Sequence, residues 1–235
     1  MARLGRLFVP GYPQLVLQRG NNGAALFLDE EDYRRFLHIL RESAREASLA
    51  IHAYVLMPDH VHLLLSAPTA EAVSSAVQRL GRGYVRWFND KHHRSGTLWE
   101  GRYRSTAVEP RHYTLACYRY IESNPVRRGL APDVAAYPWA SGRHHVGLAP
   151  DPLISDHACY WALGNTPFER QGAYRRLLDA AVPAGEIEAI RYAGHRGWLL
   201  GEVPSQSESG LVRRTHPLAK GRPKQLADDE NPSAL

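Results

Sequence analysis

The sequence predicts an α+β fold in which helices pack on one face of an antiparallel sheet. Three observations predict this fold. Strand-like and helical segments follow one another in the order strand, helix, strand, strand, helix, strand. Apolar residues recur every three or four positions over residues 33–47 and 73–88, which is the spacing of an amphipathic helix. Clusters of glycine, proline, asparagine and aspartate separate the segments, as turns require.

The first strand and the first helix occupy the first 47 residues. The strand is expected over residues 6–19, interrupted at Pro10-Gly11 and followed by a turn at residues 20–23. Asp29 can cap the helix that comes next, because its side chain can accept hydrogen bonds from the free N–H groups of the first turn. The apolar positions of this helix are Tyr33, Phe36, Leu37, Leu40, Ala44 and Ala47.

Two short strands are expected next, over residues 52–57 and 60–66. A helix over residues 70–91, a strand near residues 97–108 and a helix over residues 110–123 follow them. This order of elements is that of a ferredoxin-like, split β-α-β fold. Helices on one face of such a sheet would leave its other face open to a ligand.

Length and composition bound the number of domains and the compartment. With 235 residues and 44% hydrophobic content, the chain is expected to form one principal domain over residues 1–145. A small helical extension is expected over residues 146–202, with helices near 167–181 and 185–192, and a disordered basic tail over residues 203–235. The two cysteines are far apart, which argues against a disulfide framework. No apolar stretch has the length of a membrane span, so the chain is expected in the cytoplasm.

Positive charge is concentrated just after the third predicted strand. Residues 70–129 carry eleven lysines and arginines against five acidic residues, whereas residues 23–69 carry four against seven. Basic residues interleaved with aromatic ones are typical of a groove that binds the phosphates and bases of nucleic acid. The alternative is a solvated helix face. The arginines expected to contact phosphate are Arg79, Arg82, Arg86, Arg102 and Arg104.

Two histidines, His60 and His62, stand in the third predicted strand. Side chains two residues apart in a strand share a face, while Val61 and Leu63 point to the other face. Histidine is the commonest metal ligand in proteins, so the pair is a candidate for two neighbouring ligands. The pattern alone is also compatible with two half-buried, hydrogen-bonded histidines.

The last predicted helix carries a tyrosine that could act with this pair. At 100° per residue, Tyr113, Cys117, Tyr120 and Asn124 fall in one stripe. A tyrosine is a poor nucleophile at its free pKa of about 10, but a metal that polarises a scissile phosphate makes its attack feasible. Two histidines, the amide oxygen of Asn124 and phosphate oxygens would complete such a metal site.

Six segments in uninterrupted order give the chain a resemblance to a known family. They are residues 10–22, 27–32, 52–65, 98–104, 120–130 and 137–141, including HVH at 60–62 and YIESNP at 120–125. These segments resemble the HUH tyrosine transposases of the IS200/IS605 type, and more closely the relatives associated with repetitive extragenic palindromes (REP). The resemblance implies that residues 1–145 form the catalytic domain of a transposase.

The resemblance also implies an activity. Such an enzyme is a metal-dependent single-strand DNA endonuclease and strand transferase that acts on hairpin-forming repeats of a bacterial chromosome. Tyr120 would be the nucleophile and form a 5′-phosphotyrosine, and His60 and His62 would bind Mg²⁺ or Mn²⁺, with Asn124 completing the metal shell. Arg127 would contact the single-stranded or hairpin DNA, and the protein would act as a monomer or a homodimer.

Two departures from the family pattern stand out. Leu15 occupies a position of the first strand where family members often carry a histidine. The chain also continues beyond the catalytic domain, and its tail contains Lys220-Gly-Arg-Pro-Lys224, which looks like an AT-hook whose Arg222 would enter a narrow minor groove. A charged disordered tail is an equal alternative for so short a motif.

Two further functions stay open at the level of sequence. One is a domesticated hairpin-binding protein or regulator that no longer cuts DNA. The other is an RNA-binding ferredoxin-like domain, which would prefer RNA and ignore divalent metal. The presence of His60, His62 and Tyr120 together favours the nuclease, because a binding protein does not need all three.

Overall fold

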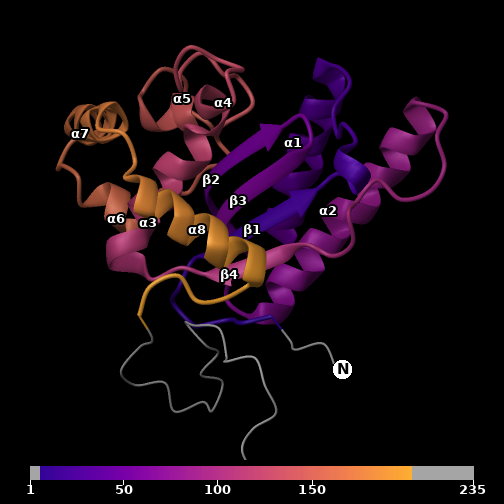
Figure 1. Ribbon diagram of the computed structural model, residues 1–235, viewed down its shortest axis with the longest axis horizontal. Helices are drawn as coiled ribbons and strands as arrows, with labels where there is room; N and C mark the ends of the chain where they lie inside the picture. The colour runs from indigo at the N-terminus through magenta and orange to yellow at the C-terminus, as the bar shows by residue number, and fades with distance from the viewer. Residues whose placement is uncertain (1–5, 203–235) are drawn as a thin grey trace, which may run out of the picture.

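The structure is a computed structural model and describes residues 6–202. Its centre is an antiparallel sheet of four strands, β1 (Gln14–Arg19), β2 (Ala50–Met57), β3 (His60–Ser66) and β4 (Arg104–Ala107). The strands lie in the order β2-β3-β1-β4, so the first strand is central and the last is at an edge (Figure 1). This confirms the predicted ferredoxin-like α+β fold. The AT-hook motif with Arg222 lies outside the described residues.

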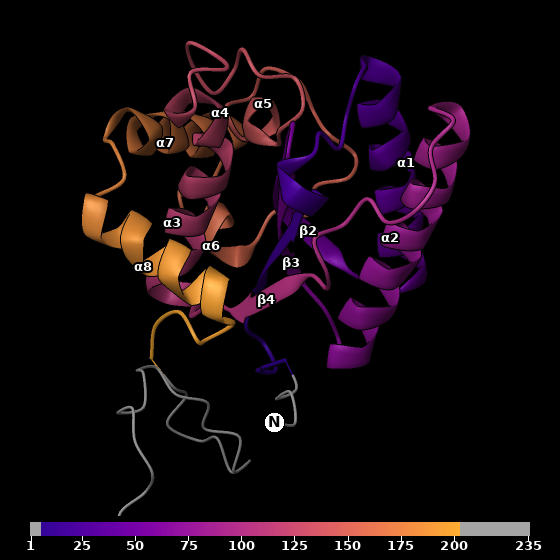
Figure 2. The same ribbon diagram turned by 45° about the vertical axis from the view of Figure 1, so that its right-hand side comes forward.

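Two long helices, α1 (Glu30–Glu46) and α2 (Ala70–Lys91), cover one face of the sheet (Figure 2). As predicted, Asp29 caps α1, in a capping box with Asp32. Apolar side chains of both helices pack against the alternate strand residues that point to this face. Those strand residues include Val16, Val61, Leu63 and Leu65, and the helices supply Phe36, Leu40, Leu80, Tyr84 and Phe88.

The other face of the sheet is also covered, which differs from the prediction that helices occupy one face. Helix α3 (Pro110–Glu122) packs across β2 and β3 on this second face (Figure 2). The physical reason is that the second face is itself apolar, and a sheet that is apolar on both faces must be covered on both. Its strand residues Leu15, Ala53, Val55, Met57 and Leu64 are buried against Cys117 and Ile121 of α3.

Three of the predicted strands differ in their bounds from the structure. β1 begins only at Gln14, because Pro10 and Gly11 form a turn in which Gly11 has a φ of 77°. β4 is limited to residues 104–107, since the segment before it forms bends and isolated bridges. β2 begins at Ala50, two residues earlier than predicted.

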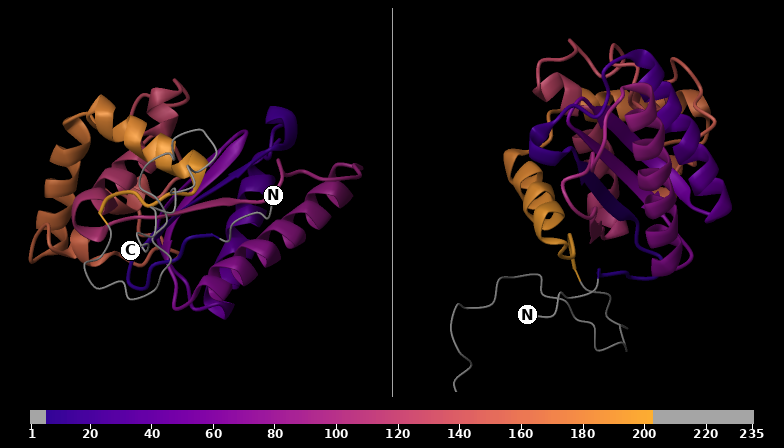
Figure 3. Two further views of the ribbon diagram at one scale, coloured as in Figure 1. Left: turned by 60° about the horizontal axis from the view of Figure 1, so that its bottom comes forward. Right: turned by 90° about the vertical axis from the view of Figure 1, so that its right-hand side faces the viewer.

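The chain after α3 adds short and long helices around the second face. The short ones are α4 (Asn124–Arg127), α5 (Gly142–His145) and α6 (Ala158–Trp161), and one further short helix, η1 (Asn21–Gly23), lies earlier in the chain, between β1 and α1. The predicted helix pair appears as α7 (Pro167–Asp179) and α8 (Ala184–Arg196). α8 packs against β4, β1 and α3 (Figure 3), and its Ile190 and Ala193 belong to the same core as α3. The domain boundary at residue 145 stays a prediction.

None of the helices in residues 6–202 combines the length and the apolar character needed to cross a bilayer.

Candidate active site

β3 places His60 and His62 side by side on the sheet face that α3 covers. Val61, between them, points to the core under α1 and α2. The two imidazole centroids lie 5.1 Å apart with their planes nearly perpendicular, and both side chains are buried. The alternation of a strand therefore produces the paired arrangement that the sequence predicts.

The hydrogen bonds of His60 fix its tautomer. Its Nδ1 lies 2.7 Å from Oδ1 of Asp59 and donates to this carboxylate. Its Nε2 then carries the free lone pair, and Nδ2 of Asn124 donates to it at 3.0 Å. Burial lowers the pKa of His60, although the neighbouring Asp59 opposes this shift. A neutral histidine whose outer nitrogen is held by a carboxylate is the usual arrangement of a metal-binding histidine.

His62 is the most isolated polar group of the site. Its Nδ1 is buried and has no hydrogen-bond partner in the part of the chain that the structure describes. Burial holds the pKa of His62 well below its usual value, so the ring is neutral. A buried polar atom without a partner needs an explanation, and an unfilled ligand position is one. A neutral imidazole carries one nitrogen lone pair, which is what a metal ligand requires.

Tyr120 reaches this pair from α3. Its ring meets the His62 ring edge-to-face, with centroids 5.5 Å apart. The guanidinium of Arg127 lies over the Tyr120 ring, 4.6 Å from its centroid, and also donates to the Tyr120 carbonyl oxygen at 2.7 Å. Burial raises the pKa of Tyr120, and the charge of Arg127 partly offsets this. Tyr120 lies in the last turn of α3 and Asn124 begins α4, and both side chains line the same cavity.

These side chains surround a cavity of about 490 Å³ between the second face of the sheet, α3 and α8. Its lining includes His60, His62, Tyr120, Asn124 and Arg127, all of which the sequence singles out as site residues. The lining also includes residues that the prediction missed, namely Arg19 of β1, Arg128, and Arg191 and His195 of α8. Little in the sequence marks these residues as part of a site. Only the spacing of Arg191 and His195, which is one helical turn, sets those two apart.

The other predicted DNA-binding arginines lie away from the cavity or at its edge. Arg79, Arg82 and Arg86 are on α2, on the opposite side of the sheet from His60 and His62. Arg79 pairs with Glu46, and Arg82 hydrogen-bonds Gln78 within its own helix. Arg102 is exposed in the segment before β4, and Arg104 bonds His195 at the α8 side of the cavity. DNA contact by these arginines stays a prediction.

Comparison with known proteins adds a family to this geometry. The family described as "Transposase IS200 like" matches residues 20–124, which include both cavity histidines, the tyrosine and the asparagine. The match spans less than half of the 235-residue chain, and over it the chain is similar to IS200-like transposases. This similarity supports a transposase function.

Solved structures also match the chain, one of them with a similar fold. One, described as a REP-associated tyrosine transposase bound to a REP hairpin, is 19% identical over 68% of this chain and 93% of its own, with a TM-score of 0.55. A second, described as a putative transposase from Deinococcus radiodurans R1, is 26% identical over 52% of this chain and 96% of its own, with a TM-score of 0.37. No curated protein matches the chain.

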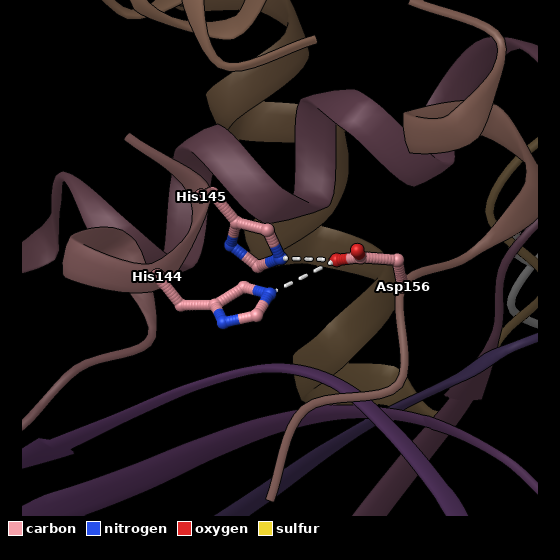
Figure 4. A group of neighbouring side chains, drawn as sticks. All are labelled: His144, His145 and Asp156. Carbon is pink, nitrogen blue, oxygen red and sulfur yellow. Dashed lines mark ion pairs between the residues drawn. The ribbon is translucent and has the colours of Figure 1, made fainter. Parts of the chain in front are cut away.

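Two other groups of histidines and carboxylates occur in the described part of the chain. One is His144, His145 and Asp156, in which each histidine Nε2 faces Asp156, at 3.3 and 3.4 Å (Figure 4). The Asp151 backbone N–H donates to Nδ1 of His144, so Nε2 of that ring carries its proton and offers no lone pair to a metal. The group therefore forms a buried charge cluster. In the other, Asp29, Asp32 and His92, Lys91 forms ion pairs with both carboxylates.

The charge cluster extends to Glu122, two residues after Tyr120. Nδ1 of His145 lies 2.6 Å from the Glu122 carboxylate, which also accepts from the hydroxyl of Tyr174 at 2.6 Å. Burial opposes a charge on His145, but Glu122 and Asp156 outweigh it and raise the pKa of His145 to about 9. The cluster thus ties the end of α3, and with it Tyr120, to α5 and α7.

This cluster predicts a pH dependence of stability. The pKa of His145 is higher in the folded than in the unfolded chain, where a histidine titrates near 6.5, so its stabilisation is full below about pH 6.5 and is lost as pH rises through about 9. Thermal unfolding across this range should show Tm falling with pH. His145→Gln should lower Tm at about pH 6.5 and flatten this fall. An unchanged slope in the variant would contradict the assignment.

Proposed function

We propose that this chain is a metal-dependent single-strand DNA endonuclease and strand transferase with Tyr120 as its nucleophile. The observation that carries the proposal is the meeting of His60, His62, Asn124 and Tyr120 in one cavity. They come from two segments that are far apart in the sequence. A hydrophobic core is stable without polar side chains, so packing alone does not explain why these four meet. Because one chain supplies them all, we propose that it can act as a monomer.

The residues present fit a divalent cation. His60 offers its Nε2 lone pair, oriented by Asp59, and His62 offers a ring with no hydrogen-bond partner in the described chain. Asn124 now points its Nδ2 at His60, and rotation of the amide by half a turn would present Oδ1 instead. These donors suit Mg²⁺ or Mn²⁺ when phosphate oxygens and water complete the shell. When bound, such a cation polarises the scissile phosphate and stabilises the charge that develops on it.

In the proposed reaction, Oη of Tyr120 forms a bond to phosphorus while the bond from phosphorus to the 3′-oxygen breaks. The phenol proton passes to solvent, and the leaving 3′-oxygen takes up a proton and becomes a free 3′-hydroxyl. The 5′ end stays on the enzyme as a phosphotyrosine, so a 3′-hydroxyl can reverse the step and rejoin a strand. The charge of Arg127 partly offsets the rise that burial causes in the pKa of Tyr120, and in the proposed reaction it stabilises the phenolate during attack.

The proposed substrate is a hairpin with single-stranded flanks, in the nucleoid of a bacterium. A REP hairpin is what the REP-associated relative of similar fold is described as binding. The excess of cavity arginines over acidic residues suits such a polyanion. The proposal of a hairpin as substrate rests on this likeness and on the family match, and not on a contact that reads bases.

Covalent capture tests the proposal. The full chain would be incubated with labelled hairpins that carry single-stranded flanks, with Mn²⁺ or with EDTA, then denatured and separated on a gel. We expect a protein–DNA adduct with Mn²⁺, and its complete loss with EDTA, because the phosphate is not polarised without the cation. Binding of the same hairpins without an adduct under any condition would instead favour a DNA-binding protein that does not cut.

A further inference from the structure

Helix α8 forms a fixed wall of the active-site cavity. Its Ile190 is completely buried, and the backbone carbonyl of Ala193 accepts a hydrogen bond from Oγ1 of Thr106 at 3.0 Å. After the helix, Leu200 bonds the backbone of Ala107 at 2.9 Å and so continues the attachment to β4. α8 lies beside α3, across the sheet from α1 and α2 (Figure 2; Figure 3). The helix is therefore held in place by the fold.

The wall lies close over β1 at Gly194. A Cβ added at Gly194 would stand 4.0 Å from the Leu15 side chain, which is ordinary van der Waals contact. Leu15 is buried in the same core as Ile190 and Ala193. The buried Leu15 side chain therefore gives α8 an apolar surface on which to pack.

α8 turns two polar side chains, Arg191 and His195, to the cavity that contains His60, His62 and Tyr120. They are one helical turn apart and so lie on one face of the helix. Nη1 of Arg104 donates to Nδ1 of His195 at 2.5 Å, which leaves an N–H at Nε2 of a neutral His195 ring. Burial and the charge of Arg104 lower the pKa of His195, which keeps this tautomer neutral.

The charge of Arg191 is not neutralised within the described chain. Arg19 pairs with Glu100 at 3.6 Å and Arg128 with Asp59 at 3.4 Å, while Arg127 stacks on Tyr120. Arg191 is exposed and forms no ion pair with a carboxylate among residues 6–202. A phosphodiester accepts both ion pairs and neutral hydrogen bonds at its oxygens. An unpaired guanidinium and a neutral N–H donor on one side of a cavity can supply one contact of each kind.

We propose that Arg191 and His195 form a second phosphate-binding site, which holds a backbone phosphate next to the scissile one. The proposal rests on the proposed function only for the identity of that neighbouring phosphate. It makes α8 part of the DNA-binding surface and assigns the helix a role outside the matched transposase region. Arg191 supplies charge and His195 supplies a directional hydrogen bond.

Equilibrium binding tests the site without any need for cleavage. The full chain carrying Tyr120→Phe would be titrated with a fluorescent thymidine homopolymer at several salt concentrations, alone and with added changes in α8. Arg191→Ala should weaken binding several-fold and reduce the slope of log K against log salt by about 0.7, the value for one phosphate of a single strand. Arg191→Lys should restore the slope, because it restores the charge.

His195 makes a separate prediction in the same assay. His195→Ala should weaken binding with no change of the salt slope, because a neutral donor releases no counterion. Arg196→Ala is the matched control, since Arg196 is on the same helix but its guanidinium lies over Tyr192 and Trp198. This control should bind like the parent, and all variants should keep the parental Tm.

Three results would overturn the site. The first is an Arg191→Ala variant that keeps the parental salt slope. The second is an Arg191→Ala variant that binds DNA more tightly than the parent, as expected if α8 blocks the cavity. The third is a His195→Ala variant that keeps the parental affinity. Failure of the proposed function is distinguishable from these. A wild-type chain that binds DNA but forms no adduct would reject the nuclease and leave the binding result for Arg191 unaffected.

Discussion

Tyr120→Phe is expected to abolish the covalent protein–DNA adduct and strand cleavage while leaving DNA binding and stability unchanged. The variant removes only the hydroxyl oxygen, which has no hydrogen-bond partner in the described chain. The ring contacts with His62 and Arg127 are kept, because they involve the aromatic carbons. Loss of a nucleophile can cost an enzyme on the order of 10⁶-fold in rate, so no residual cleavage should be detectable.

The measurement is the covalent capture assay, with fluorescence anisotropy for binding and thermal unfolding for stability. Tyr113→Phe is the matched control, because Tyr113 is on the same stripe of α3 but lines a different cavity. That variant should form the adduct at the wild-type rate. An adduct that persists in Tyr120→Phe would assign the nucleophile to another residue.

Local periodicity explains why the centre of the site could be predicted from the sequence. The period of two in a strand places His60 and His62 on one face, and the period of 3.6 in a helix places Tyr120 one turn from Asn124. Both rules act within a few residues. The structure adds that the strand face and the helix stripe meet in one cavity, and the order of the strands allows this.

The features that the sequence did not reveal depend on contacts between distant segments. Arg191 and His195 reach the cavity only because α8, which begins 77 residues after β4 ends, returns to β4 and β1. The charge excess of residues 70–129 likewise could not show which arginines face the cavity. Charge counts carry no information on the face of the sheet, so the α2 arginines and Arg127 looked equivalent.

His60→Ala and His62→Ala are each expected to abolish Mn²⁺-dependent cleavage while DNA binding stays within a few-fold of wild type. Phosphate contacts from arginines supply most of the affinity for DNA, and these variants keep all of them. The histidines are expected to hold the cation that polarises the scissile phosphate, so their loss removes the chemistry and not the complex. His38→Ala is the control, because His38 is an exposed histidine of α1 on the other side of the sheet.

Thermal unfolding separates a metal-binding role of His62 from a structural one. A ligand that binds only the folded state stabilises it by RT ln(1 + [L]/Kd), so Mn²⁺ should raise the Tm of the wild-type protein. The His62 side chain makes no hydrogen bond in the described chain and borders the cavity, so His62→Ala breaks no hydrogen bond and should change the Tm little without metal. The rise with Mn²⁺ should disappear in the variant. A low Tm without metal, together with lost DNA binding, would mean that the ring is structural and would remove the basis for a cation at this site.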